Sequence, residues 1–201
     1  MDPARIDSMI DFLALADRLK HIERRGITRG PDGTGRQENS AEHCWNVALV
    51  ALLLQGEVIE KPDLAHVLAM ITVHDLVEIE AGDTFAYDEA HVLTQAAREQ
   101  AAAEIVFGTL PPDLGARFRA LWEEFEAGET PEARFAMACD RAQGFLQGIL
   151  SGGHWKAQGV AEARTRGRMD RARAVAPEFD ALIEALYERA RRGDMFAPSA
   201  P

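Results

Sequence analysis

The side chains best suited to chemistry in this sequence are two histidines and two aspartates: His43, His74, Asp75 and Asp140. His74 and Asp75 are neighbours in a strongly apolar segment, so both should be buried. An isolated buried charge is costly, and such groups must pair with each other or bind a cation. Two imidazoles and two carboxylates suit one divalent ion and leave about two positions of an octahedral site open to water. Open positions are typical of a catalytic ion rather than a structural one.

The elements that carry these residues are expected to be helices, because Ala, Leu, Glu and Arg dominate and alternating β-branched segments are absent. We therefore predict an all-α fold, a single helical bundle around a central metal site. The expected helices span 4–24, 40–56, 62–79, 87–108, 113–128, 130–150, 156–175 and 177–192. Asn39 with Glu42 predicts a capping box, and Thr130-Pro131 predicts a helix start.

Three of these helices bring the four side chains together. In helix 62–79 an apolar stripe at 4-3-4-3 spacing continues into Asp75 and Glu78. His43 lies in the first turn of helix 40–56, above an apolar stripe, and Asp140 lies within helix 130–150 on a face of short side chains. A His-Asp pair alone would favour a structural ion-pair network. Three separate segments, each with a buried group able to bind metal, favour an ion.

Two further polar residues extend this constellation. Glu78 lies one turn beyond His74 and points towards the same site, where burial would raise the pKa of its carboxyl and suit it to general acid–base catalysis. The alternative is that Glu78 orients a histidine ligand. Gln143 lies three residues after Asp140 and is a candidate substrate contact, or else a hydrogen-bond partner of a neighbouring helix. Glu99 is expected on a solvated face, with a place near the site as the alternative.

The strings ENSAEHCW, HDLVEIEAGD and ACD, in this order, resemble the HD superfamily of metal-dependent phosphohydrolases. The resemblance is strongest to the subgroup of bacterial 5′-deoxynucleotidases and their eukaryotic HD-domain relatives, and extends from about Leu19 to Gln147. It implies a homodimer that removes phosphate from (deoxy)nucleoside 5′-monophosphates by attack of a metal-bound water. By position, it implies that the metal ligands are His43, His74, Asp75 and Asp140, that Glu78 and Asp83 are catalytic, and that Arg24 and Arg36 bind substrate.

One position departs from the nucleotidase pattern. A tryptophan is expected directly after the first arginine or after the glycine that follows, and this chain has Arg25 and Ile27 there. Two alternatives therefore stay open: a nucleoside triphosphate or other phosphoanhydride hydrolase, and a non-catalytic module that binds metal and nucleotide. The ligand set suits Mn, Co, Fe or Ni, and Mg and Zn stay possible.

Length and charge limit the remaining possibilities. The 201 residues suit one domain, with a metal-site core of about 19–150, C-terminal helices within about 156–192 and a frayed tail over 193–201. A net charge of −11 argues against binding nucleic acid through bulk charge. Without a membrane span or secretory leader, we expect a cytoplasmic protein that acts on a small phosphorylated substrate. The glycine-rich segment 26–39 lacks a P-loop pattern and is expected to be a surface loop, with a lid as one possibility.

Overall fold

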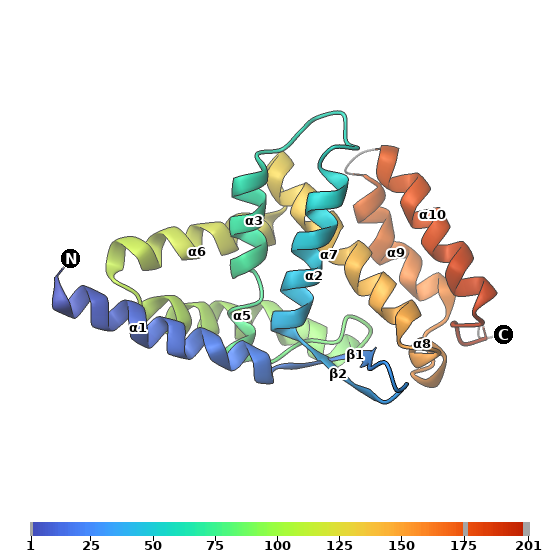
Figure 1. Ribbon diagram of the computed structural model, residues 1–201, viewed down its shortest axis with the longest axis horizontal. Coiled ribbons are helices and arrows are strands. Elements are labelled where there is room, and N and C mark those ends of the chain that lie inside the picture. The colour runs from blue at the N-terminus through green and yellow to red at the C-terminus, as the bar shows by residue number, and fades with distance from the viewer. Residues whose placement is uncertain (1, 175–176, 199–201) are drawn as a thin grey trace.

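The computed structural model describes residues 2–174 and 177–198. Within them the chain forms a helical body with one small hairpin, and the two ends lie at opposite ends of the molecule (Figure 1). The predicted all-α fold is confirmed, apart from the hairpin. The elements are α1 (Pro3–Asp17), the 3₁₀ helix η1 (Arg18–His21), β1 (Glu23–Arg29), β2 (Gly35–Asn39), α2 (Ser40–Leu54), α3 (Leu64–Val73), α4 (Glu78–Ala81), α5 (Glu89–Gly108), α6 (Pro112–Ala127), α7 (Pro131–Leu150), α8 (His154–Ala157), α9 (Glu162–Arg173) and α10 (Pro177–Arg192).

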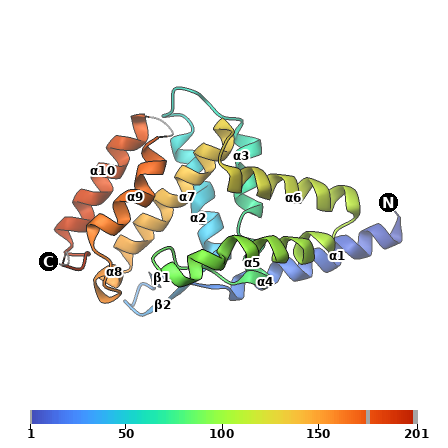
Figure 2. The same cartoon turned by 180° about the vertical axis from the view of Figure 1, so that it is seen from behind.

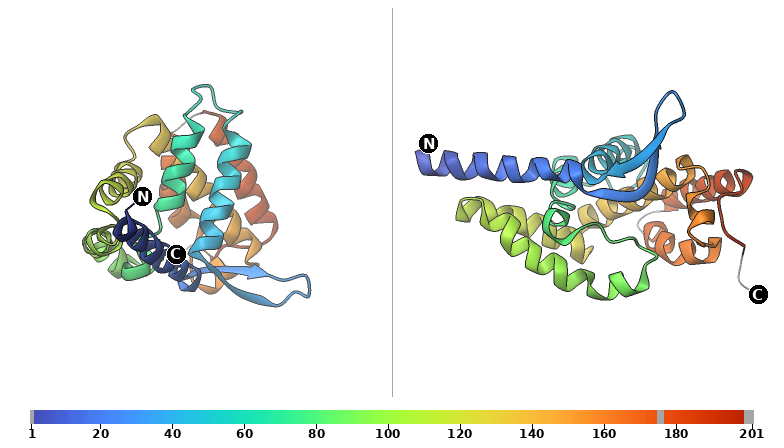
Figure 3. Two further views of the ribbon diagram at one scale, coloured as in Figure 1. Left: turned by 60° about the vertical axis from the view of Figure 1, so that its left-hand side comes forward. Right: turned by 90° about the horizontal axis from the view of Figure 1, so that it is seen from below.

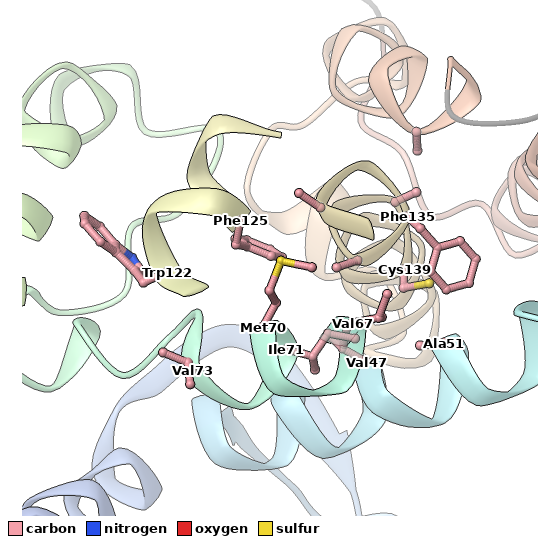
Figure 4. Close-up of a cluster of buried hydrophobic side chains, with 14 of the residues drawn as sticks. Val47, Ala51, Val67, Met70, Ile71, Val73, Trp122, Phe125, Phe135 and Cys139 are labelled. Carbon is pink, nitrogen blue, oxygen red and sulfur yellow. The ribbon is translucent and has the colours of Figure 1, made fainter. Parts of the chain in front are cut away.

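Helix α7 is the centre of the body. It packs against α2, α3, α6, α9 and α10, and from behind, α9 and α10 lie on one side of it with α5 and α6 on the other (Figure 2). The core close-up shows the side chains that α2, α3 and α7 direct at each other, among them Val47, Val67, Ile71 and Cys139 (Figure 4). Each of these is at most 1% exposed, so a dry core fixes α2 and α7, which carry His43 and Asp140, and α3, which directly precedes His74 and Asp75.

The region after α1 differs from the prediction. The expected helix 4–24 ends at Asp17, and the expected loop 26–39 is an antiparallel hairpin whose turn projects from the body (Figure 3). Its strands are mostly polar and lack the alternation that would have predicted them. The base of the hairpin is tied to α7, because Gln147 donates to the carbonyl of Ile27 at 2.8 Å and the Ile27 amide donates to Ser151 at 2.7 Å. The predicted capping box at Asn39 and Glu42 is confirmed.

The expected helix 62–79 is interrupted just before His74 and Asp75. Helix α3 starts after Asp63, whose side chain caps it, and ends at Val73. Beyond Val73 the backbone bonds tighten to three-residue spacing, with the amide of Leu76 donating to Val73 and that of Glu78 donating to Asp75. The continuous stripe predicted from Leu64 to Glu78 is therefore wrong beyond Val73. His74 and Asp75 lie in the turn between α3 and α4.

The C-terminal part is more ordered than predicted. The expected helix 156–175 is two helices, α8 and α9, with residue 175 outside the described residues. The tail expected to fray over 193–201 is packed as far as it is described. Phe196 stacks on Trp155 with ring centroids 5.4 Å apart, and the amide of Ala197 donates to Val160 at 3.0 Å. Residues 199–201 lie outside the described part.

Gly148 permits the packing of Trp155 against α7, since a Cβ there would lie 2.2 Å from the Trp155 ring.

None of the helices in the described part of the chain is both long and apolar enough to cross a membrane.

Candidate metal centre and active site

The four predicted ligands meet beside the core of the molecule. His43 is fully buried in the first turn of α2, and His74 and Asp75 are less than 9% exposed. His43, His74 and Asp75 each offer one ligand atom, and these atoms lie within 4.8 Å of one another. Asp140, from the middle of α7, places Oδ1 2.9 Å from Nε2 of His43. The structure thus brings together the residues that the sequence predicted from three separate segments.

The hydrogen bonds of the two imidazoles leave both Nε2 atoms without a proton. His74 Nδ1 lies 2.7 Å from the carbonyl of Ile71 and must donate to it, because a carbonyl only accepts. Gln143 uses its amide nitrogen to donate to Glu38 at 3.1 Å, so its oxygen accepts from His43 Nδ1 at 2.6 Å. Each histidine therefore turns the lone pair of Nε2 towards the site.

This arrangement fits a bound cation. Nε2 of His74 is buried and forms no hydrogen bond among the described residues, although Oδ1 of Asp75, a second acceptor, lies 3.1 Å from it. Burial, together with the positive charge of Arg24, lowers the pKa of His43 to about 4, so that its imidazole is neutral at physiological pH. Nε2 of His43 and Oδ1 of Asp140 are then two acceptors 2.9 Å apart, a contact that a divalent ion between them would stabilise.

Arg24 lies among the carboxylates of the site. Its guanidinium is 3.2 Å from Asp75, 3.4 Å from Asp83, 3.9 Å from Glu78 and 3.8 Å from Glu38. Burial raises the pKa of Asp75 and Glu78, and Arg24 only partly opposes the shift. So many acids around one arginine leave a surplus of negative charge that suits a divalent cation.

The remaining predicted residues divide into two groups. Glu78 accepts from Ser40 at 2.6 Å, and Asp83 lies beside Arg24, so both are at the site. Gln143 is 3% exposed and contacts the ligand His43. Arg36 lies outside the site: its side chain is 61% exposed and pairs with Glu42 at the surface. The structure therefore gives no support to the predicted substrate contact of Arg36. This residue lies on β2 near the hairpin turn, away from the predicted metal ligands.

Two adjoining cavities open at the site. The metal-facing cavity is lined by residues that include His74, Asp75, Glu78, Glu99 and Glu126. The side cavity lies between β1, α7 and the segment before α5, and its wall includes Arg25, Phe85, Tyr87, His154 and Trp155. Six residues line both cavities: Arg24, Asp83, Thr84, Asp140, Arg141 and Arg168. These shared residues mark the junction through which a substrate could extend from one cavity into the other.

With this geometry in place, comparison with known proteins identifies the family. A family model described as HD domain matches residues 16–180. The chain belongs to the HD domain family. Among relatives, the 5′-deoxynucleotidase HDDC2 of Xenopus laevis is 28% identical over 185 residues, which cover 90% of this chain and 87% of that protein. The human HDDC2 is 28% identical over 141 residues, covering 70% of this chain and 66% of the human protein.

Solved structures give the same family relationship. A predicted metal-dependent phosphohydrolase from Magnetospirillum magnetotacticum superimposes with a TM-score of 0.87 at 40% identity, over 97% of both chains. The PH0347 protein of Pyrococcus horikoshii has a TM-score of 0.63 at 21% identity and shares the fold. The HD resemblance predicted from the sequence strings is confirmed.

Several residues of this HD site were missed in the sequence. Glu38 and Ser40 lie within the quoted ENS string, and that string was the clue to their place beside Gln143 and Glu78. Glu99, expected on a solvated face, is 6% exposed and lines the metal-facing cavity. Arg141 and Arg168 had no motif to mark them, since only the packing of α9 against α7 brings them to one place.

Proposed function

We propose that this HD protein is a metal-dependent phosphomonoesterase that removes phosphate from (deoxy)nucleoside 5′-monophosphates. The main observation is the pair of acceptors formed by His43 Nε2 and Asp140 Oδ1, beside the Nε2 of His74, which forms no hydrogen bond within the described residues, in a cavity that Arg24 also lines. The names of the HDDC2 relatives and of the 40% identical phosphohydrolase support the same activity. The family relationship and the ion-binding geometry are independent lines of support.

The ligands proposed for the ion are His43, His74, Asp75 and Asp140. A divalent ion held by them would lower the pKa of a water molecule and neutralise charge on a phosphoryl oxygen. Mn, Co, Fe, Ni, Mg and Zn are the candidates, since mixed nitrogen and oxygen ligation does not select one of them.

Glu78 is proposed to handle the proton. Burial, and then the negative charge of Asp75, raise the pKa of Glu78 well above its usual value, so the carboxyl can hold a proton for the leaving oxygen. The hydrogen bond from Ser40 fixes the side chain in position. Arg24 would bind phosphate oxygens, and Asp83 would orient its guanidinium. Phosphoryl transfer requires mainly such positioning and charge neutralisation.

The side cavity offers a place for the nucleoside. Phe85 and Tyr87 pack edge to face with centroids 5.3 Å apart, and His154 lies 6.1 Å from Phe85. Aromatic faces of this kind can stack on a base. These aromatic side chains come from the segment before α5 and from α8. They would replace the tryptophan of the nucleotidase pattern, in whose place this chain has Arg25 and Ile27.

Phosphate release from a panel of ribo- and deoxyribonucleoside 5′-monophosphates tests this function. The protein is first treated with chelator and then resupplied with Mn²⁺, Co²⁺ or Mg²⁺. We expect Glu78→Gln to retain metal but to lose turnover by about 100-fold or more, as expected for the loss of a general acid. The matched control is Glu80→Gln, since Glu80 pairs with Arg18 at 2.9 Å instead of facing the site. Folded, metal-loaded protein that releases no phosphate from any monophosphate would contradict the proposal and favour the non-catalytic module.

The same family relationship supports proposals about assembly and location. We infer a single HD domain over the chain that forms a homodimer in the cytoplasm. Exposed apolar side chains on α1 and α2, such as Leu13, Trp45 and Leu53, provide a candidate dimer face, being 64–74% exposed. Light scattering should give twice the 22.1 kDa mass of the chain. A monomeric mass at micromolar concentration would exclude the dimer.

A further inference from the structure

Three arginines near the metal centre have no part in the function proposed above. Arg141 directly follows the ligand Asp140 on α7, Arg168 comes from α9, and Arg25 lies on β1 next to Arg24. Arg141 and Arg168 line both the metal-facing cavity and the side cavity, and Arg25 lines the side cavity. Arg141 and Arg168 therefore lie at the junction, where a substrate bound in the metal-facing cavity would extend into the side cavity. Arg25 lies on the side-cavity side of this junction.

Within the part of the chain that the structure describes, these arginines have no protein partner. Among the described residues, Arg25, Arg141 and Arg168 form no ion pair and no side-chain hydrogen bond, whereas on α9 the neighbouring Arg164 and Arg166 both pair with glutamates. Arg141 is only partly exposed, whereas Arg25 and Arg168 are exposed. Arg141 and Arg168 line the same two cavities, and unpaired guanidinium groups in one cavity wall favour an anionic ligand.

The charges of the two cavities differ in sign. The lining of the metal-facing cavity carries six carboxylates against three arginines, which suits a cation. The lining of the side cavity carries four arginines against three carboxylates. Those three carboxylates are already engaged, since Glu38 and Asp83 face Arg24 and Asp140 contacts His43. The free charge of the side cavity is therefore positive, more than a neutral nucleoside requires.

We propose that Arg141 and Arg168, with Arg25, bind a second phosphate group of the substrate, at the junction of the two cavities. This inference rests on the proposed phosphatase function and extends its substrate class from nucleoside monophosphates to nucleotides with two phosphates. One phosphate lies at the metal centre and is released as inorganic phosphate, with water supplying the oxygen. The other stays on the product. It is either linked through an anhydride, as in a nucleoside 5′-diphosphate, or through a second ester, as in a nucleoside 3′,5′-bisphosphate.

Steady-state kinetics of the metal-loaded enzyme test the inference and separate the two linkages. The substrates are deoxyadenosine 5′-monophosphate, 5′-diphosphate and 3′,5′-bisphosphate. We expect kcat/KM for one of the two-phosphate substrates to exceed that for the monophosphate by on the order of tenfold or more, the usual size of a charge-assisted contact. Arg168→Gln should remove most of this advantage and change the monophosphate value less than about threefold, because Arg168 is expected to contact only the second phosphate.

Matched variants complete the test. Arg171→Gln removes the same charge from the same helix but lines neither cavity, and should keep the advantage. Arg141→Gln should act like Arg168→Gln, with metal content measured because Asp140 is adjacent. Equal kcat/KM for all three substrates would overturn the inference. So would an equal loss for mono- and two-phosphate substrates in Arg168→Gln, since that would place Arg168 on the phosphate that is cleaved.

A binding measurement distinguishes failure of the subsite from failure of the phosphatase function. Metal-loaded Glu78→Gln protein is titrated calorimetrically with the same three nucleotides. Tighter binding of a two-phosphate nucleotide by on the order of tenfold, lost in the Glu78→Gln/Arg168→Gln protein, supports the subsite even if no nucleotide is hydrolysed. Equal affinity for all three nucleotides overturns it, even if the monophosphate is a good substrate.

Discussion

The metal-facing cavity and the side cavity adjoin each other, but they differ in whether their charged side chains have protein partners. At the metal centre most charged or polar side chains have a protein partner: Gln143 holds His43, Ser40 holds Glu78, and Arg24 lies among four carboxylates. At the junction with the side cavity, Arg141 and Arg168 have no ion pair within the described residues. The difference indicates that one region is organised before ligand arrives, whereas the other leaves its charges available to the ligand.

The largest effect is expected from removing a ligand at the organised centre. Asp75→Asn should abolish tight metal binding and lower phosphate release by about 1,000-fold or more, because the ion loses a charged ligand and Arg24 loses a partner at 3.2 Å. Metal content after gel filtration and kcat/KM measure this. The control Asp7→Asn changes an exposed carboxylate on α1 and should leave both unchanged. An Asp75→Asn protein with full metal content would remove Asp75 from the ligand set.

A smaller effect is expected one contact away from the ion. Gln143→Leu removes the acceptor that holds the proton on His43 Nδ1, and should weaken metal binding by about 10–100-fold. Competition with a chelating dye gives the affinity. Gln147→Leu is the matched control, because Gln147 lies one turn further along α7 and bonds Ile27. Unchanged affinity in Gln143→Leu would show that Gln143 does not position His43, and would leave its predicted contact with substrate as the alternative.

Metal removal should make stability depend on pH. Burial raises the pKa of Asp75 to about 8 and that of Glu78 above its usual value in the folded protein. A carboxyl whose pKa is higher in the folded than in the unfolded protein stabilises the folded state at pH values below its unfolded pKa, about 4. This stabilisation is lost as the pH rises through the folded pKa. The metal-free protein should therefore unfold at a lower temperature at pH 8 than at pH 5.5, by a few degrees.

Differential scanning fluorimetry of chelated and Mn²⁺-loaded protein measures this dependence. The loaded protein should reverse the trend, because a bound cation favours the ionised carboxyls. A metal-free protein whose unfolding temperature rises steadily from pH 5.5 to pH 8 would show that these carboxyls are not destabilised by burial.

The smallest effect is expected outside both cavities. Arg36→Ala removes an exposed residue paired with Glu42, and should change kcat/KM by less than about twofold and leave the unfolding temperature nearly unchanged, because solvent screens exposed ion pairs. Initial rates at low substrate concentration give the comparison. A tenfold loss would restore the substrate contact that the sequence motif predicted for Arg36.

The sequence predicted the metal centre better than the fold around it. His43, His74, Asp75 and Asp140 could be found because buried polar groups in apolar segments are conspicuous and because the strings around them resemble the HD pattern. The hairpin could not be found, since its polar strands are stabilised by each other and by α7 rather than by an apolar face of their own. The end of α3 before His74 was missed for a related reason: apolar spacing continues through the turns that replace the helix.

Residue types and local spacing by themselves determined that the chain is helical and that three segments each carry a buried side chain able to bind metal. The resemblance of the strings around these side chains indicated the HD family. Only the tertiary structure decided which nitrogen of His43 faces the proposed metal site, because that depends on Gln143 and Glu38 from two other elements. It also decided that Arg36 lies outside the site and that Arg141 and Arg168 line the same two cavities. Local sequence indicates which polar side chains are buried. The residues that these side chains contact come from distant segments, which only the packing of the helices brings together.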